Sequence, residues 1–339
     1  MKLLKLSLAI LVLATAGFAG YAYMVYKSEV TTEPQVQESV KNGFEQVLAA
    51  ANPEADYKKA PEYFELPGSR WIPQTFNNCG PAATVMLLEH FGYNVTQEQT
   101  KASLRAGDSD TNIFMYEISD YLRADYGLES KVLFNGNLEV VKTLIANGFY
   151  VMAEDWMHPN EDIGHVLIFR GYDDREGVLI ADDSYIGVGV KYPYSQFDEL
   201  QWKPFNREYM PVYKKEDEAV VKAIIGENWH EKTMYENGVE TSLKEVGVNP
   251  NDMYAWFNLG MDYYGLGQYE NAKEAFERSR SFGWPMRMLW YQIEPVKTYN
   301  KLGEYEKAIE LANIGLRGNE KFTELQEEKE FALKGLLSN

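Results

Sequence analysis

The chain has 339 residues, of which 45% are hydrophobic and 14% aromatic, so it can build two or three domains with apolar cores and is not a disordered chain. It carries 51 acidic against 33 basic residues, a formal net charge of −18, and no basic stripe, which argues against nucleic-acid binding. Its single cysteine rules out an internal disulfide.

The N-terminal segment predicts export. Lys2 and Lys5 precede an uncharged, largely apolar run that continues to Tyr26, which places the N-terminus on the cytoplasmic side and the rest of the chain outside the membrane. Ala14–Ala16 resembles a signal-peptide cleavage site, whereas the length of the run and its tyrosines suit an uncleaved anchor. We favour the anchor over cleavage. Residues 1–27 are therefore expected to be a signal peptide or transmembrane anchor, and the protein to be extracytoplasmic, either anchored or secreted.

Residues 28–64 are polar and punctuated by proline, as is typical of a linker or stalk. A short amphipathic helix is predicted from Val36 to Leu48, where it is followed by Asn52 and Pro53.

The only cysteine lies at the predicted start of a helix. Asn77 and Asn78 can cap this helix, Pro81 suits its first turn, and Gly92 ends it. One buried stripe is expected, formed by Val85, Leu87, Leu88 and Phe91. The unpaired N–H groups and the dipole of a helix N-terminus favour the thiolate of Cys79, which is the nucleophilic form. A small buried hydrophobe is the alternative interpretation of a lone cysteine.

Hydrophobic periodicity predicts a mixed series of elements after this helix. Helices are expected at 96–104, 111–126 and 138–146, and strands at 130–134 and 149–154. Two further strands, 164–171 and 178–181, flank the turn at 172–177 and form a hairpin. His165 begins the first of these strands and Asp182 follows the second. Because these two ends are neighbours in an antiparallel pair, the carboxylate can hydrogen-bond the imidazole.

His165 is the best of the four histidines as a partner for Cys79. His90 lies eleven residues further along the same helix, about 16 Å away at ~1.5 Å per residue, so it cannot reach Cys79. His230 belongs to the later helical part, and His158 lies in a polar loop.

Gln74 precedes Cys79 by five residues and can present a side-chain amide to an oxyanion. A helix-terminal thiolate, the histidine base His165, the carboxylate Asp182 and this amide are the parts that a thiol protease requires.

The ordered set of motifs resembles a known family. It consists of Gln74, the run Cys-Gly-Pro-Ala at 79–82, the run Gly-His-Val-Leu-Ile-Phe-Arg-Gly-Tyr-Asp-Asp at 164–174, and Ile-Ala-Asp at 180–182. Over residues 65–215 the chain resembles the bacteriocin-processing, double-glycine-leader cysteine peptidases and their free-standing relatives. The resemblance implies a papain-like α+β domain in which Cys79 is the nucleophile, His165 the base, Asp182 the orienting carboxylate and Gln74 the oxyanion donor.

Two departures from the family pattern stand out. The family typically has proline after the aspartate, whereas this chain has Asp183, so the register between Asp182 and Asp183 is open, and we prefer Asp182. Transporter-linked members carry membrane spans and an ATPase, and neither a polytopic region nor a Walker motif is present here. The substrate of those members therefore does not carry over.

Residues 216–339 are expected to be all-α and to resemble tetratricopeptide repeats. The clearest unit runs from Asp252 to Pro285, with Ala272 letting its helices approach and with aromatic residues filling the space between them, namely Trp256, Tyr263 and Phe276. A looser unit follows around Gly303, and Glu216–Val248 is a candidate degenerate first unit. Such repeats can bind a peptide or a partner protein, or brace the neighbouring domain.

The sequence therefore predicts an extracytoplasmic cysteine peptidase acting on a peptide or protein substrate. Two alternatives stay open: a catalytically inactive papain-like binding module, and a cell-wall amidase or acyl transferase that uses the same residues. The four histidines and one cysteine show no metal-ligand spacing, so neither a metal nor another cofactor is expected.

Overall fold

The computed structural model describes residues 56–105, 112–285 and 287–338. The predicted N-terminal segment (1–27) and the helix at Val36–Leu48 lie outside these residues. Within the described ranges, no helix combines the length and apolar character needed to cross a membrane.

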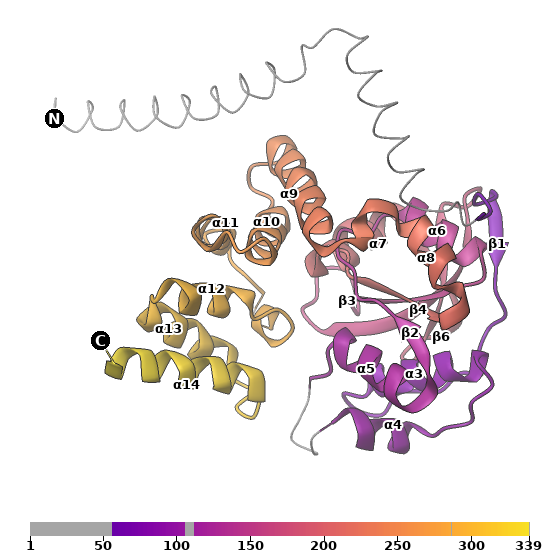
Figure 1. Ribbon diagram of the computed structural model, residues 1–339, viewed down its shortest axis with the longest axis horizontal. Helices are drawn as coiled ribbons and strands as arrows, with labels where there is room; N and C mark the ends of the chain where they lie inside the picture. The colour runs from indigo at the N-terminus through magenta and orange to yellow at the C-terminus, as the bar shows by residue number, and fades with distance from the viewer. Residues whose placement is uncertain (1–55, 106–111, 286, 339) are drawn as a thin grey trace, which may run out of the picture. The chain divides into compact units, whose positions relative to one another are not determined.

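An antiparallel sheet forms the centre of the first half (Figure 1). Seven strands of the described chain belong to it, and six of them follow the order β2-β7-β3-β4-β5-β6, while β1 pairs with the far end of β4. Their bounds are β1 Tyr63–Glu65, β2 Leu128–Ser130, β3 Tyr150–Trp156, β4 Gly164–Asp173, β5 Val178–Asp183, β6 Gly187–Pro193 and β7 Tyr209–Lys214.

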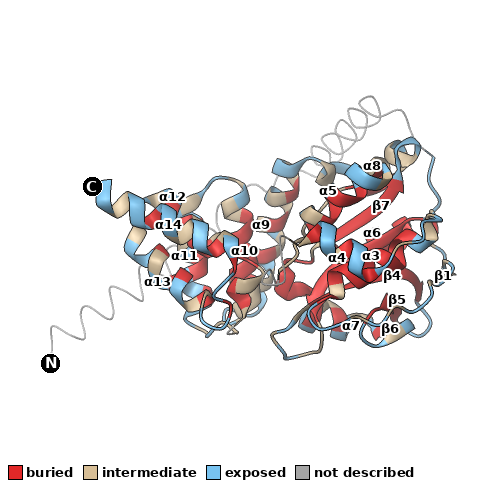
Figure 2. Ribbon diagram, turned by 90° about the horizontal axis from the view of Figure 1, so that it is seen from below, coloured by how far each residue is buried: buried red, intermediate tan, exposed pale blue. Residues whose placement is uncertain are grey.

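Helices cover both faces of this sheet (Figure 1). On one face lie α3 (Cys79–His90), α4 (Gln97–Leu104) and α5 (Met115–Tyr126), and on the other lie α6 (Leu138–Ala146) and α8 (Glu218–Ile225). Strand alternation assigns the two cores: Met152 and Ile168 face α3 and α5, whereas Val151 and Phe169 face α6 and α8. Both faces are buried (Figure 2), so these central strands are apolar on both sides rather than alternating.

The cysteine-bearing helix α3 is buried more completely than its predicted stripe. Every residue from Gly80 to Leu88 is buried, so the expectation of a single apolar face is wrong. Asn78 occupies the N-cap position, and Gly92 beyond the helix has a φ of 84°. Because α3 is packed on all sides between the sheet and the other helices, its N-terminus holds a fixed position.

The local signals place most of the neighbouring elements correctly. The Thr96 side chain caps α4 in a capping box with Gln99, and α6 has the predicted bounds. Helix α5 starts at Met115 instead of residue 111, because the Glu117 carboxylate accepts a hydrogen bond from the Phe114 N–H and fixes the cap there. The strand expected at 130–134 is wrong beyond its first residue: β2 ends at Ser130, and only an isolated bridge at Leu133 follows it.

The second half is helical. Successive helices pack in antiparallel pairs, with bounds α9 Glu231–Val248, α10 Met253–Gly265, α11 Tyr269–Arg280, α12 Glu294–Leu302, α13 Tyr305–Gly315 and α14 Thr323–Ser338. Gly260 lies directly against the Phe276 ring, where a Cβ would come within 2.5 Å of it, so glycine is required for α10 and α11 to approach. Phe257 and Phe276 pack at 5.1 Å between ring centroids, whereas Trp256 and Tyr263 are only partly buried.

The predicted degenerate first unit, Glu216–Val248, is divided by its packing. Val221, Ile224 and Ile225 of α8 belong to the core on the α6 face of the sheet, while α9 packs against α10. Helix α8 is thus part of the covering of the sheet. The division of the chain at residue 216 stays a prediction.

Polar side chains join the sheet region to the helices. The Asp262 carboxylate on α10 accepts hydrogen bonds from the side-chain amides of Asn206 (2.8 Å) and Asn135 (3.2 Å). Lys203 donates to Asp252 at 2.8 Å. Because Asp262 is fully buried, its charge state contributes to the stability of this junction.

We expect Asp262→Asn to change how stability depends on pH. Burial raises the pKa of Asp262 to about 8, so the folded chain holds a proton that the unfolded chain releases above about pH 4. The stability that this group contributes is therefore complete at low pH and falls as pH rises towards 8. In urea unfolding, the free energy of unfolding of the variant should increase relative to that of the wild type between pH 5 and 8, by up to roughly 1.4 kcal/mol per pH unit. A constant difference would contradict this assignment.

Candidate active site

Cys79 is the first residue of α3 and is half-buried. It lines a small cavity of about 70 Å³ together with Gly80, Glu154, Gly164, His165, Val166 and Tyr291, among others. The structure thus brings Cys79 and His165, which lie 86 residues apart in the sequence, to one cavity.

His165 is the second residue of β4 and is almost completely buried. Its Nε2 lies 3.0 Å from Oδ1 of Asp183. The same carboxylate accepts hydrogen bonds from the backbone N–H groups of Tyr185 (2.6 Å) and Ile186 (3.0 Å) and from the Tyr192 hydroxyl (2.5 Å). These four contacts hold Asp183, and Asp183 fixes the plane of the imidazole.

The other ring nitrogen of His165 is left for the thiol. Among the described residues Nδ1 has no partner in hydrogen-bonding geometry. Nε2 is held by Asp183, whereas Cys79 and His165 line one cavity and shift each other's pKa values. Nδ1 is therefore the ring nitrogen that remains available to the thiol.

Electrostatics favour the charged form of this pair. Burial raises the pKa of the Cys79 thiol, but the interaction with His165 and with nearby backbone N–H groups outweighs burial, and the net pKa is lowered. For His165 burial lowers the pKa, yet Asp183 and Cys79 together raise it well above 6.5. Burial opposes ionisation of Asp183 as well, but His165 brings its pKa down to about 2. These shifts favour a thiolate and an imidazolium beside a carboxylate.

The preference for Asp182 as the partner of His165 is wrong. Asp182 pairs with Ile168 across β4 and β5 and shares its face of the sheet, whereas His165 lies three residues earlier and on the opposite face. The Asp182 carboxylate instead accepts hydrogen bonds from Arg170 Nε (2.7 Å) and from the Ser69 N–H (2.9 Å). Asp182 anchors the chain that precedes α3.

Gln74 lies beside the end of β5 and does not line the small cavity. Its N–H donates to the Ser184 carbonyl (2.9 Å), and its Oε1 accepts from the Ser184 hydroxyl (2.8 Å). Because the carbonyl end of the side chain is held, the NH₂ end is left as a donor. Ser184 directly follows Asp183, so Gln74 is fixed next to the His165 partner.

The remaining histidines lie elsewhere. His90, at the end of α3, stacks on Tyr150 with ring centroids 3.9 Å apart. The His158 ring contacts Tyr185 at 5.8 Å, and His230 immediately precedes α9. In the described parts of the chain, no group of three or more His, Cys, Asp or Glu residues is arranged to hold a metal.

Two residues of the cavity were missed from the sequence. Tyr291 comes from the segment before α12, and its ring covers the backbone of Gly164, where a Cβ would come within 2.5 Å of it. No local signal identifies a tyrosine 126 residues downstream of His165. Glu154, on β3, is buried at the cavity, and the signal for it is the acidic pair Glu154 and Asp155 within a fully buried strand.

We expect Asp183→Asn, but not Asp182→Asn, to reduce the ionisation of Cys79. Without the carboxylate the imidazolium loses its main support, so the His165 pKa falls and the Cys79 pKa rises. A rise of one unit lowers the rate of iodoacetamide labelling about tenfold at a pH below the Cys79 pKa. Labelling rates across pH 4–10 give both pKa values. Equal effects of the two substitutions would refute the assignment to Asp183.

Comparison with known proteins identifies both parts of the chain. The model of the Peptidase_C39 like family matches residues 64–210, and that of the tetratricopeptide repeat matches residues 253–281. No curated protein matches the chain.

Two solved structures are similar to part of the chain. One is a double-glycine-motif protease from an AMS/PCAT transporter in complex with the leader peptide, at 17% identity and a TM-score of 0.34, covering 44% of this chain and 94% of that one. The other is the peptidase domain of Streptococcus ComA, a bifunctional ABC transporter involved in a quorum-sensing pathway, at 13% identity and a TM-score of 0.35, covering 43% and 99%. The resemblance predicted from the sequence is confirmed: the chain contains a Peptidase_C39-like α+β region followed by a helical region with a tetratricopeptide repeat.

Proposed function

We propose that the chain is a cysteine peptidase that hydrolyses peptide bonds through Cys79, His165 and Asp183. The observation that carries the proposal is the placement of His165, with Asp183 on one ring nitrogen and Cys79 lining the same cavity. The match of residues 64–210 to a peptidase-like family supports it independently.

In the proposed mechanism the Cys79 thiolate attacks the carbonyl carbon of the scissile bond, and the carbonyl oxygen becomes an oxyanion. The His165 imidazolium transfers its proton to the leaving amine as the C–N bond breaks, which leaves a thioester on the sulfur. His165, now neutral, takes a proton from water, and the resulting hydroxide attacks the thioester. The acid product leaves, and the thiolate and imidazolium are restored.

The Gln74 amide and the N–H groups at the start of α3 are the proposed oxyanion donors. Ser184 holds the Gln74 carbonyl, so the amide donor is oriented before substrate binds. Asp183 remains a carboxylate throughout and keeps the imidazole in place.

The surroundings of Cys79 suit a peptide substrate. Phe76, three residues before it, is 90% exposed, and Ile163, just before β4, is also exposed. Tyr185 and Ile186 are exposed directly beyond Asp183. Apolar side chains exposed on both sides of a nucleophile can bind the side chains of an extended peptide.

The location and the role of the helical region are part of the proposal. The apolar N-terminal segment supports export of the chain, as an anchored or secreted protein. The tetratricopeptide-like helices supply a surface for a peptide or partner protein.

Turnover of defined substrates tests the reaction. We expect the full chain to cleave members of an unbiased peptide library and Cys79→Ala to cleave none, since removal of the nucleophile removes the covalent step. The same incubation with muropeptides examines the amidase alternative. Turnover of muropeptides alone would refute the peptidase proposal, and the absence of any turnover despite rapid iodoacetamide labelling would favour a binding module.

Gln74→Ala should lower kcat by roughly 10²–10³-fold, because the lost donor acts on the oxyanion of the transition state. Gln74→Glu is the matched variant: its carboxylate still accepts from Ser184 but has no donor, so it should be equally impaired. Peptide kinetics measure kcat, and iodoacetamide labelling checks that Cys79 still ionises. Full activity of Gln74→Glu would rule out the donor role.

A further inference from the structure

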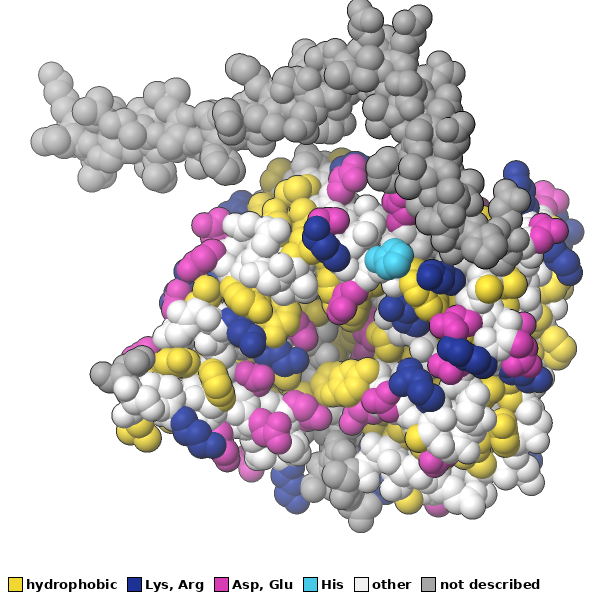
Figure 3. Space-filling model, in the orientation of Figure 1, with side chains coloured by type: hydrophobic (Ala, Val, Ile, Leu, Met, Phe, Trp, Pro, Cys, Tyr) yellow, Lys and Arg dark blue, Asp and Glu magenta, His cyan; other side chains and the backbone are white. Residues whose placement is uncertain are grey.

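A second cavity, of about 340 Å³, lies between the sheet region and the helices. Its walls come from the start of α5, the segment after β2, α9, α10 and the segment leading into α12. In the space-filling view, hydrophobic side chains and charged side chains of both signs surround a hollow in the middle of this face (Figure 3). The volume lies at the lower end of the ~300–1,000 Å³ typical of ligand pockets.

This cavity adjoins the Cys79 site. Phe114 and Tyr291 line both cavities. Glu154, at the Cys79 cavity, hydrogen-bonds Glu208, which lines the larger one. The two spaces are therefore adjacent, and the larger cavity is a candidate subsite for a peptide held at Cys79.

The apolar walls suit a long, unbranched side chain. Phe114 and Tyr116 stack with centroids 5.3 Å apart, and Phe134 and Tyr235 stack at 6.1 Å, so flat ring faces border the space. Met261 adds an adaptable wall on the α10 side. Ring faces of this kind pack against methylene groups and attract cations.

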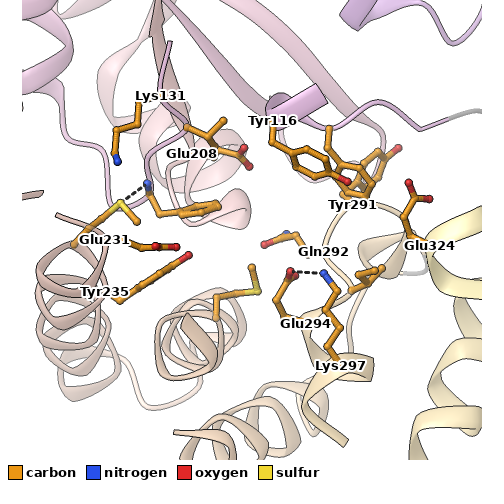
Figure 4. A pocket seen from close by; sticks show the side chains of 16 residues that line it. Tyr116, Lys131, Glu208, Glu231, Tyr235, Tyr291, Gln292, Glu294, Lys297 and Glu324 are labelled. Carbon is orange, nitrogen blue, oxygen red and sulfur yellow. Dashed lines mark hydrogen bonds and ion pairs between the residues drawn. The ribbon is translucent and has the colours of Figure 1, made fainter. Parts of the chain in front are cut away.

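Three acceptor groups border the interior. Gln292 is only 6% exposed, its Nε2 donates to the Pro204 carbonyl (2.8 Å), and its oxygen points into the cavity (Figure 4). No residue in the described ranges donates a hydrogen bond to that oxygen. The Glu208 and Glu231 carboxylates border the same space (Figure 4). An ammonium or guanidinium group has donors only and therefore complements all three.

The two lysines of the lining are already engaged. Lys297 pairs with Glu294 at 3.4 Å, and the Lys131 ammonium lies 5.1 Å from the centre of the Trp229 ring. Their charges are directed to these partners, so Gln292, Glu208 and Glu231 are left to bind a ligand.

We propose that this cavity binds a lysine or arginine side chain of the peptide substrate, with the methylene groups between the aromatic rings and the cation at Gln292, Glu208 and Glu231. The inference rests on the proposed peptidase function and names the substrate class for that site. It also assigns the helical region a direct part in specificity, because Gln292 and Glu231 belong to it.

The protonation of the carboxyl pair fits this occupant. Burial raises the pKa of Glu208 to about 8 and that of Glu154 well above its usual range, so the pair holds a proton while the cavity is empty. An arriving cation stabilises the Glu208 carboxylate and lowers its pKa. The site thus holds no unpaired buried charge before binding. When a cation binds, Glu208 supplies the negative charge that pairs with it.

The test uses the full chain and peptides that share one cleavable sequence. At each position near the scissile bond the residue is lysine, norleucine or glutamate, which separates charge from the apolar stem. We expect the wild type to prefer lysine over norleucine in kcat/KM by about tenfold at one position. Glu231→Gln should reduce that ratio, and Glu231→Lys should abolish it or reverse it towards glutamate. Glu240→Gln, on the same helix and paired with Lys244, is the matched control and should keep the wild-type ratio.

Binding to Cys79→Ala, followed by fluorescence anisotropy of the same peptides, gives a readout that needs no turnover. Lysine-selective binding that Glu231→Lys removes supports the cavity even where no peptide is cleaved, and in that case only the peptidase proposal fails. Cleavage without lysine preference, with norleucine preferred, or with a preference that survives Glu231→Lys overturns the cavity proposal and leaves the peptidase proposal standing.

Discussion

The imidazole of His165 can act only because two elements that lie far apart in the sequence hold its neighbours. Strand β5 supplies Asp183 to one ring nitrogen, and the buried helix α3 brings Cys79 to the same cavity as the imidazole. Neither element can shift easily, since α3 is enclosed on all sides and β5 lies inside the sheet. Close packing of the two cores is therefore the constraint on which the geometry of the site depends.

Features set by local chemistry could be predicted from the sequence. The start of α3, the capping of α4 and the hairpin that presents His165 follow from residues within a few positions of each other. The choice between Asp182 and Asp183 depended on register instead. An offset of one residue moves a side chain to the other face of a sheet, and β5 is apolar on both faces, so its pattern gives no indication of which face is which.

Residues brought in by tertiary packing could not be predicted. The positions of Tyr291 and Gln292 are set by how the helical pairs dock on the sheet region. That docking depends on buried contacts such as the hydrogen bond between Asn206 and Asp262. Their own neighbourhood carries no motif beyond that of a connecting segment. The repeat pattern predicts that residues 216–339 are helical. It does not predict which surface these helices present to the Cys79 site.

Because Gly164 has no side chain, the peptidase-like region cannot be separated from the C-terminal helices without changing the cavity of Cys79. The Tyr291 ring rests on that backbone, one residue before the imidazole, so the C-terminal helices form part of the wall around the nucleophile. A fragment cut after β7 would retain the sulfur and the imidazole and lose this wall. The position of this one aromatic ring therefore links access to the sulfur to the segment that precedes α12.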